Sequence, residues 1–428
     1  MLLILAGASI ASITGYVSLP DNAKVAVDSA RQDTTVEQNM VNKIDALFKE
    51  YLPATPPAGG ETPLITTATG IHSKTTEYQD AKGNKIVVPG GFKVRTDLAT
   101  TVDKGIVIED STGDSNSTGN QFVWVPIGTI TKSDDTEVTI EFGRYNFHAE
   151  NHDTPVQYAK NGGWNAEIAT SGYGYDDSYA YTIFDGYTEE PTTEGTNREA
   201  HFAGKLPKGN ATALNLEKFI TTSITNGGYY IARYEASFGS GDQISSVTNG
   251  STSAGIAGVT NQKPYFKQST SASESDDMGA VTSTPGMLWN NIRQGDASLA
   301  CRNLYAGNEY NNQDFVQCDL VNSYAWDTAI VFIEKCSGKT DYSSTLYGNE
   351  TVQNTGESSD NPCNIYDMSG NLDEWSTESS TGSQNGWYLS EVMRGGYSYG
   401  DDIQGGRRYS FYRVCNPYTG FRGVLYVL

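Results

Sequence analysis

The sequence predicts an α+β fold, with a loop-rich head domain that follows an N-terminal helical stalk. The run Gln121–Pro126 predicts a strand, because short apolar runs of this kind are typical of buried strands. Two segments with helical spacing of apolar residues, Pro285–Leu304 and Ser323–Lys335, predict helices that pack on a sheet. With 428 residues, 37% of them hydrophobic, and 45 glycines, the chain is long enough for a folded core with extensive loops.

The chain is strongly acidic, with a formal net charge of -22 at pH 7. Binding to a phosphate backbone needs clustered lysine and arginine, so this charge argues against nucleic acid as a partner. The acidity is compatible with a secreted or surface protein. The alternative is that it only keeps an exported chain soluble.

The N-terminus predicts a helical stalk or anchor over residues 1–52. Met1–Ile13 is apolar but too short to span a bilayer, which needs about 20 residues. The amphipathic segment that follows, Asp21–Tyr51, has one apolar helical face, formed by Val36, Met40, Ile44, Leu47, Phe48 and Tyr51. An apolar helix that continues into an amphipathic one resembles the N-terminus of type IV pilin-like proteins, which implies self-assembly through this helix. A plain signal-peptide core or anchor is the alternative.

The head domain is predicted over residues 76–428, after a proline- and glycine-rich linker over 53–75. Besides the elements named above, four further elements are expected in chain order: a hairpin at Thr76–Val88 with a Lys-Gly-Asn turn, a strand at Gly105–Glu109, a helix at Leu214–Thr222 and a strand at Gly227–Ser237.

The cysteines give no metal-finger spacing, because they lie in the C-terminal third without a Cys-x-x-Cys pair. They are Cys301, Cys318, Cys336, Cys363 and Cys415. An odd count leaves at least one thiol unpaired in a monomer. One or two disulfides are compatible with an exported chain, and the spacing does not assign their pairing.

Two histidines, His148 and His152, are four residues apart, which on a helix would bring them together as metal ligands. The surrounding sequence, FHAENHDTP, does not predict a stable helix, and no third histidine is near. Metal catalysis is therefore not expected at this pair.

Three strings near the C-terminus carry the most information. They are NPCNIYDMSGNLDEWS at Asn361–Ser376, Arg-Gly-Gly at Arg394–Gly396 and Gly-Phe-Arg at Gly420–Arg422. Together they resemble the sulfatase-modifying-factor family, which comprises formylglycine-generating enzymes and many non-enzymatic relatives. The resemblance implies a C-type-lectin-like head domain, and it leaves the function open between an enzyme and a binding protein.

The resemblance also implies a calcium site, because the Gly-Asn-x-x-Glu-Trp loop of the family holds calcium through oxygen ligands. The matching residues here are Asn371 and Glu374, with the carbonyl of Leu372 as a third ligand. The alternative is a loop that only hydrogen bonds and a buried Trp375 hold in place.

Formylglycine-generating enzymes use a pair of cysteines shortly after the glycine-glycine turn. The corresponding stretch here, Tyr397–Gly406, contains no cysteine. Without a thiolate this position has no soft metal ligand and no redox nucleophile. The sequence therefore predicts a non-catalytic member, and a formylglycine-generating-type oxidoreductase is an alternative.

The segment between Gly396 and Gly420 predicts a ligand-binding face. It is rich in tyrosine, aspartate, serine and asparagine, the composition of protein surfaces that evolve to bind. The expected contact residues are Tyr397, Tyr399, Asp401, Asp402, Tyr409, Tyr412, Asn416 and Tyr418. Three arginines are expected to make buried structural hydrogen bonds instead: Arg394, Arg413 and Arg422. The arrangement resembles the variable C-termini of proteins that retroelements diversify.

These observations predict a bacterial cell-surface or extracellular protein, membrane-anchored or assembled into a pilus through its N-terminus. Its head would bind a protein or glycan on another cell or surface, without catalysis. The same observations also allow a structural pilin-like filament subunit or a phage receptor-binding tip.

Overall fold

The structure is a computed structural model. It describes residues 62–111, 118–145, 216–239, 263–272, 285–307, 314–348, 351–380, 391–396 and 417–428, together with shorter pieces between them. The predicted stalk, residues 1–52, lies outside the described residues. Within the described part of the chain, no helix combines the length and the apolar character that a membrane crossing requires.

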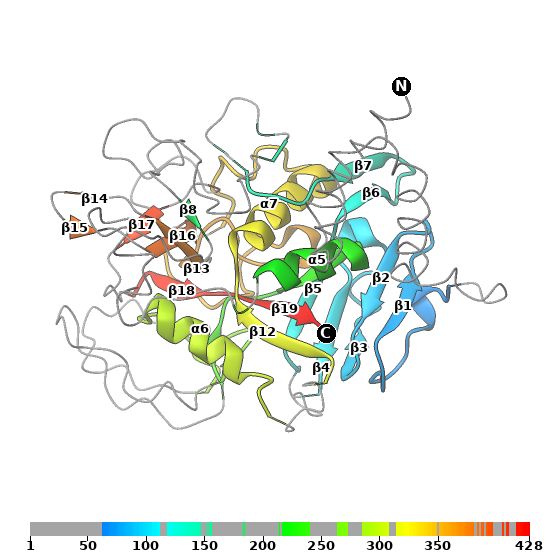
Figure 1. The fold of residues 1–428 in the computed structure, drawn as a ribbon, viewed down its shortest axis with the longest axis horizontal. Helices are drawn as coiled ribbons and strands as arrows, with labels where there is room; N and C mark the ends of the chain where they lie inside the picture. The colour runs from blue at the N-terminus through cyan, green and yellow to red at the C-terminus, as the bar shows by residue number, and fades with distance from the viewer. Residues whose placement is uncertain are drawn as a thin grey trace, which may run out of the picture. The chain divides into compact units, whose positions relative to one another are not determined.

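A six-stranded sheet forms the centre of the head domain, in the order β12-β19-β9-β5-β4-β3 and antiparallel throughout. The C-terminal strand β19 lies inside this sheet, between β12 and β9 (Figure 1). The bounds in chain order are β3 (Phe92–Val94), β4 (Val107–Asp110), β5 (Gln121–Pro126), β9 (Gly228–Ala232), β12 (Val316–Leu320) and β19 (Gly423–Val427). Every residue of β5 and β9 is buried, so both faces of the sheet are covered.

Two helices cover one face of the sheet, α5 (Leu216–Asn226) and α7 (Ser323–Ser337). Tyr229 of β9 contacts both of them. Its ring lies 5.5 Å from the ring of Phe219 in α5, and its hydroxyl donates to the carbonyl of Ala325 in α7 at 2.5 Å. The two predicted helices at these places are therefore confirmed.

Aromatic side chains fill the opposite face. Neighbouring residues in a strand point to opposite faces, so Tyr230 points away from the helices and donates to the carbonyl of Val87 at 2.9 Å. On the same face Phe122 packs against the rings of Phe266 at 5.6 Å and Phe92 at 6.1 Å. The core therefore lies on both sides of the sheet.

The predicted helix at Pro285–Leu304 is wrong over its first part, because α6 spans only Gln294–Asn303. Gly286 and Asn291 have left-handed φ values of 86° and 57°, which a helix does not accommodate. Between them the backbone N–H of Trp289 donates to another segment, the carbonyl of Ala236, at 2.9 Å. The apolar spacing in this part reflects an extended segment that is buried.

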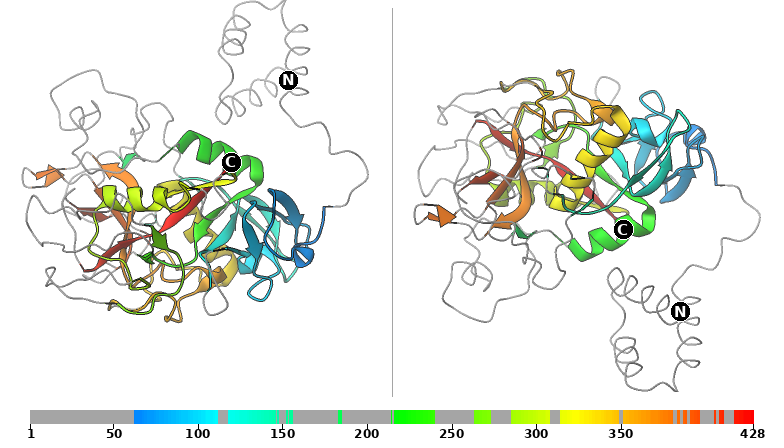
Figure 2. Two further views of the ribbon diagram at one scale, coloured as in Figure 1. Left: turned by 90° about the horizontal axis from the view of Figure 1, so that it is seen from below. Right: turned by 90° about the horizontal axis from the view of Figure 1, so that it is seen from above.

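A second sheet carries the C-terminal motifs, in the order β17-β16-β13-β18, with β8 also paired to β13. The strands β13 and β18 are parallel, and the other pairs are antiparallel. The bounds are β8 (Ile183–Phe184), β13 (Asp373–Ser380), β16 (Glu391–Gly395), β17 (Arg408–Ser410) and β18 (Thr419–Phe421). This sheet and the hairpin β1-β2 lie at opposite ends of the head domain (Figure 2).

The remaining strands pair in twos: β1 (Thr76–Gln79) with β2 (Lys85–Val88), β6 (Gly128–Thr131) with β7 (Glu137–Ile140), β10 (Ser237–Phe238) with β11 (Pro264–Tyr265), and β14 (Ser383–Gln384) with β15 (Trp387–Tyr388). Three 3-10 helices complete the described elements: η2 (Ile65–Thr67), η3 (Val102–Lys104) and η7 (Pro362–Asn364). The predicted hairpin at Thr76–Val88 is confirmed. The described part of the chain is thus an α+β fold.

The head domain begins earlier than the predicted boundary at Thr76. Pro63–Leu428 forms one compact unit. Ile65 is fully buried, and the carbonyl of Pro63 accepts a hydrogen bond from the backbone N–H of Gln79 at 3.0 Å. The last part of the predicted linker therefore packs against the head, because it carries apolar residues that the core can bury.

Candidate functional site

Strand β13 lies between β16, which leads into the Arg-Gly-Gly motif, and β18, which leads into the Gly-Phe-Arg motif. In the ladder, Glu374 of β13 is opposite Arg394 of β16 on one side and opposite Gly420 of β18 on the other. Strands β16 and β18 are therefore two strand spacings apart, roughly 10 Å. Residues 397–418, which we call the C-terminal excursion, connect β16 on one side of β13 with β18 on the other, and they include β17, which pairs with β16 at the edge of the sheet.

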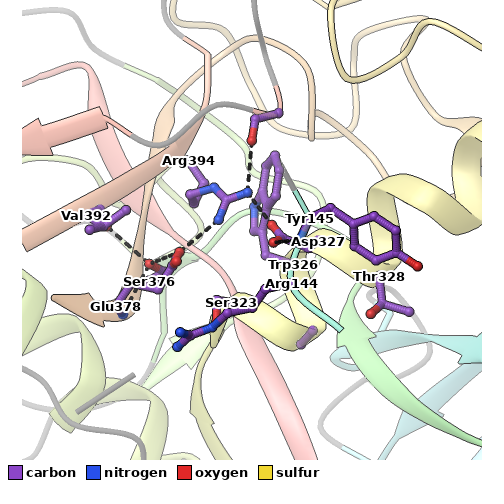
Figure 3. A network of polar contacts seen from close by, with 12 residues as sticks. Arg144, Tyr145, Ser323, Trp326, Asp327, Thr328, Ser376, Glu378, Val392 and Arg394 are labelled. Atoms are coloured by element: carbon purple, nitrogen blue, oxygen red, sulfur yellow. Dashed lines mark hydrogen bonds and ion pairs between the residues drawn. The ribbon is translucent and has the colours of Figure 1, made fainter. Parts of the chain in front are cut away.

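The first anchor of the excursion is Arg394, whose side chain is fully buried (Figure 3). Its Nη1 donates to Glu378 at 2.8 Å, and its Nη2 pairs with Asp327 and donates to the carbonyl of Gly405 at 2.9 Å. The guanidinium lies over the ring of Trp326, 4.4 Å from its centroid. A buried charge is stable only when it is paired, and two carboxylates surround this one.

A second set of hydrogen bonds holds Glu378 and Asp327, the partners of Arg394, and the backbone of β13 in place. The hydroxyl of Ser376 donates to Glu378 at 3.1 Å, and the backbone N–H of Tyr145 donates to Asp327 at 2.8 Å. The side-chain amide of Gln294 donates to the carbonyls of Ser376 and Glu378 at 2.6 and 2.8 Å. The position of Arg394 is therefore fixed from β13, from α7 and from the start of α6.

The second anchor is Arg422, which is also fully buried. Its Nε and Nη2 donate to Oε1 of Glu374 at 2.8 and 2.6 Å, and it donates to the carbonyls of Ala232 and Tyr366 at 2.9 and 2.7 Å. Burial lowers the pKa of Arg422, but the acidic neighbours, Glu374 first and then Glu235 and Asp367, together outweigh burial, so the net shift of this pKa is upward. The guanidinium therefore stays charged.

Helix α7 joins the two anchors through one side chain. The indole N–H of Trp326 donates to Oε2 of Glu374 at 3.1 Å, and the ring of the same residue packs against the guanidinium of Arg394. The next residue, Asp327, pairs with Arg394. The prediction that Arg394 and Arg422 make buried structural contacts is confirmed. Arg413 lies outside the described residues.

Two of the predicted calcium ligands, the side chains of Asn371 and Glu374, are engaged with protein groups. Oδ1 of Asn371 accepts from the backbone N–H of Gln353 at 2.7 Å, and its Nδ2 donates to Glu235. The backbone N–H of Leu372 donates to the same Glu235 carboxylate at 3.1 Å. Both carboxylate oxygens of Glu374 accept hydrogen bonds from buried donors.

This geometry does not fit a calcium ion at Glu374, because the ion would displace Arg422 and leave a buried guanidinium unpaired. The loop instead has the features of one that hydrogen bonds and a buried indole hold in place. Trp375 is fully buried, and its indole N–H donates to the carbonyl of Ile292 at 2.7 Å. Among the described residues no group of three His, Cys, Asp or Glu side chains is arranged to hold a metal ion. Calcium binding stays a prediction.

Of the predicted histidine pair, His148 lies outside the described residues. His152 has its Nε2 3.3 Å from Glu334 and 3.4 Å from the hydroxyl of Ser343. These contacts connect it to the C-terminal end of α7.

Two of the eight predicted contact residues lie within the described part of the chain. Tyr418 is half-buried, and its carbonyl accepts from the backbone N–H of Asp373 at 2.8 Å. Tyr409 is in β17, opposite Val392 of β16. The other six, Tyr397, Tyr399, Asp401, Asp402, Tyr412 and Asn416, lie outside the described residues.

Gly405 is a third fixed point, inside the excursion, that was not predicted from the sequence. This residue is buried, its N–H donates to the carbonyl of Ser343 at 2.6 Å, and its carbonyl accepts from Arg394. A Cβ here would lie 2.7 Å from the ring of Phe147. The pair Gly405-Gly406 is the signal that could have indicated it, because glycine permits close approach of the backbone.

Comparison of the chain with protein-family models, with curated proteins and with solved structures found no match. The function is therefore inferred from the residues of the site itself.

Proposed function

We propose that this chain is a cell-surface or extracellular protein whose lectin-like head binds a protein or glycan on another cell or surface through the C-terminal excursion, without catalysis. Its N-terminal helix would anchor it or assemble it into a filament. The observation that carries the proposal is the attachment of both ends of the excursion to opposite sides of β13 by buried arginines.

A binding surface of this kind needs a rigid support, because disorder in the support weakens binding. Arg394 and Arg422 provide this rigid support. Both guanidiniums are fully buried, and Trp326 contacts Arg394 directly and Arg422 through Glu374, so the two ends of the excursion are attached to one helix. Residues on loops above a rigid scaffold are common places for recognition.

The composition of the excursion supports recognition rather than turnover. Tyrosine provides contact area at a low cost in conformational entropy, and serine and asparagine provide adaptable hydrogen bonds. Tyr397–Gly406 contains no cysteine that could act as a redox nucleophile. Elsewhere, burial raises the pKa of Cys336 to about 12, so this thiol stays protonated at neutral pH.

The test compares binding by the full chain with binding by a variant in which Tyr397, Tyr399, Tyr409 and Tyr412 are replaced by serine. Labelled protein is applied to a glycan array and to intact cells of the source population. We expect the variant to lose most of the binding and to keep its unfolding temperature. The control variant carries Glu137→Ser and Thr139→Ser on the exposed hairpin β6-β7, and it should bind like the unchanged chain.

Equal binding by the tyrosine variant would contradict the role of the excursion. Turnover of a cysteine-containing peptide to formylglycine would contradict the absence of catalysis. Deep sequencing of the codons for 396–420 across the source population tests diversification separately. Substitutions confined to the eight contact positions, with Arg394 and Arg422 unchanged, would indicate a diversified receptor face.

A further inference from the structure

His152 lies next to the C-terminal end of α7, and its side chain is 23% exposed. Its Nε2 is 3.3 Å from Oε2 of Glu334 and 3.4 Å from the hydroxyl of Ser343. Its ring also packs edge-to-face against the ring of Phe147, with 5.4 Å between the centroids. The histidine therefore contacts one carboxylate and two neutral side chains.

Both neutral neighbours of His152 contact Gly405, the fixed point inside the excursion. The carbonyl of Ser343 accepts from the N–H of Gly405 at 2.6 Å, and the ring of Phe147 lies 2.7 Å from the place of a Cβ at position 405. Ser343 and Phe147 are buried, so they have little room to move. A change at His152 therefore reaches the excursion through one intervening residue.

Glu334 connects the histidine to Ser343 a second time. Its Oε1 accepts from the backbone N–H of Ser343 at 2.8 Å, and its Oε2 is the atom near His152. Only 9% of the Glu334 side chain is exposed, so solvent screens its charge less than it screens a charge at the surface. A proton on His152 thus places a positive charge beside a carboxylate that holds Ser343.

Among the described residues, the other charged groups on the elements around His152 have partners of their own. These contacts are Lys335 with the carbonyl of Thr139 at 2.7 Å, Lys339 with Asp360 at 3.0 Å, Asp341 with the hydroxyls of Thr345 and Tyr347 at 2.8 and 2.6 Å, Arg144 with the hydroxyl of Ser323 at 2.5 Å, and Arg394 with Asp327 and Glu378. The carboxylate that responds to the charge of His152 is therefore that of Glu334.

We propose that His152 is a pH-sensitive positioning residue for the C-terminal excursion. Histidine gains a proton as the pH falls from about 8 to about 5.5, and the charged ring then pairs with Glu334. A contact that favours the protonated form contributes most at low pH, and its contribution is lost as the pH rises. Gly405 is thus held more firmly at the lower pH. The consequence for binding rests on the proposed function: the ligand should bind more tightly at the lower pH, because a more rigid surface loses less entropy on binding.

Hydrogen exchange in the full chain tests the effect on Gly405 without a ligand. The protection factor of peptides that contain Gly405, which corrects for the pH dependence of the exchange reaction itself, is measured at about pH 5.5 and about pH 8. We expect this factor to be about fivefold higher at the lower pH.

Two variants remove the charge on either side of the pair. In His152→Gln and in Glu334→Gln the difference between the two pH values should disappear, because glutamine can still form hydrogen bonds but carries no charge. The control is His72→Gln, since the ring of His72 contacts Tyr78 in the hairpin β1-β2. This control should show the same pH effect as the unchanged chain.

Equal protection at the two pH values in the unchanged chain would overturn the proposal, and so would a full pH effect in the His152→Gln variant. The first of these results comes from the unchanged chain, so it does not depend on whether the variants fold. Binding of the full chain to intact cells at the two pH values separates the effect of His152 from the binding function itself. Absence of binding at either pH would contradict the proposed function and leave the exchange result unchanged. Equal binding at both would contradict the effect of His152 on the excursion and leave the binding function intact.

Discussion

At the scale of single residues, the candidate site depends on charges that are buried in pairs. Arg394 with Asp327 and Arg422 with Glu374 have no exposed side-chain surface. Such a pair adds little net stability compared with apolar residues, but the loss of one partner leaves the other charge buried and unpaired. The arginines therefore contribute mainly to the position of the excursion.

Replacement of Arg394 by methionine tests this role. We expect the free energy of unfolding to fall by about 3–5 kcal/mol, because Asp327 and Glu378 would remain buried without a cation. Denaturation in urea measures the change. The control is Lys85→Met, whose ion pair with Glu77 has side chains that are 41% and 51% exposed, and this variant should lose less than about 1 kcal/mol. Equal effects of the two substitutions would contradict the burial of Arg394.

Gly405 is the second residue whose role can be tested alone. A Gly405→Ala variant places a methyl group 2.7 Å from the ring of Phe147, which we expect to destabilise the fold by about 1–3 kcal/mol. At Gly307 no atom lies within 4 Å of an added Cβ, so Gly307→Ala is the matched control and should change stability little. If both variants unfold at the same temperature, Gly405 is not a fixed point of the excursion.

At the scale of elements, strands β3 and β4 are linked by charges whose protonation makes stability depend on pH. Glu109 of β4 pairs with Lys93 at 2.8 Å and with Arg95 of the neighbouring segment. Burial raises the pKa of Glu109, but its cationic partners and Gln121 together lower it below the ordinary value of 4.5. A lowered pKa in the folded state means that the pair contributes stability above pH 4.5, which is lost as the pH falls through the lower value.

The Glu109→Gln variant should therefore be less stable than the unchanged chain near neutral pH and should lose less stability on acidification. Unfolding free energies at about pH 7 and about pH 3 measure this difference. Glu137→Gln, at an exposed position of β7, is the control and should follow the unchanged chain. A Glu109→Gln curve parallel to that of the unchanged chain would exclude this contribution.

The loop that precedes β13 provides a second prediction at this scale. The side-chain oxygens of Asn371 in this loop and of Glu374 at the start of β13 accept hydrogen bonds from Gln353 and Arg422, so we expect the unfolding temperature to be the same with calcium and with a chelator. A ligand that binds only the folded state raises that temperature as its concentration increases. A rise on addition of calcium would restore the predicted site at Asn371, Leu372 and Glu374.

At the scale of the whole molecule, local sequence patterns predicted most helices and strands well, but they did not predict the long-range contacts between side chains. Strand β5 has the bounds that were predicted, Gln121–Pro126, and α7 begins after Asn322, whose side chain accepts from the N–H of Ala325. The predicted start of α6 was wrong because Gly286 and Asn291, which precede the helix, have left-handed φ values. Tertiary contacts determine the conformation there, and the local pattern does not show them. The roles of Trp326 and Asp327 could not be predicted, because their partners are far away in sequence and the amphipathic pattern of a helix does not identify them.

The proposed division between a fixed frame and a diversified excursion leads to a prediction for the whole chain. A library of the full chain is randomised, one position at a time, at the eight predicted contact residues and at Arg394, Gly405 and Arg422. Displayed variants are then selected for resistance to protease and sequenced. We expect nearly all amino acids to survive at Tyr397, Tyr399 and the other contact positions outside β17 and the half-buried Tyr418, because their replacement leaves the buried ion pairs unchanged. At the three fixed positions almost only the native residue should survive, since every replacement leaves a buried carboxylate unpaired or introduces a clash. Equal restriction at both sets of positions would mean that the excursion is part of the core, and the frame would then have no separate binding surface to support.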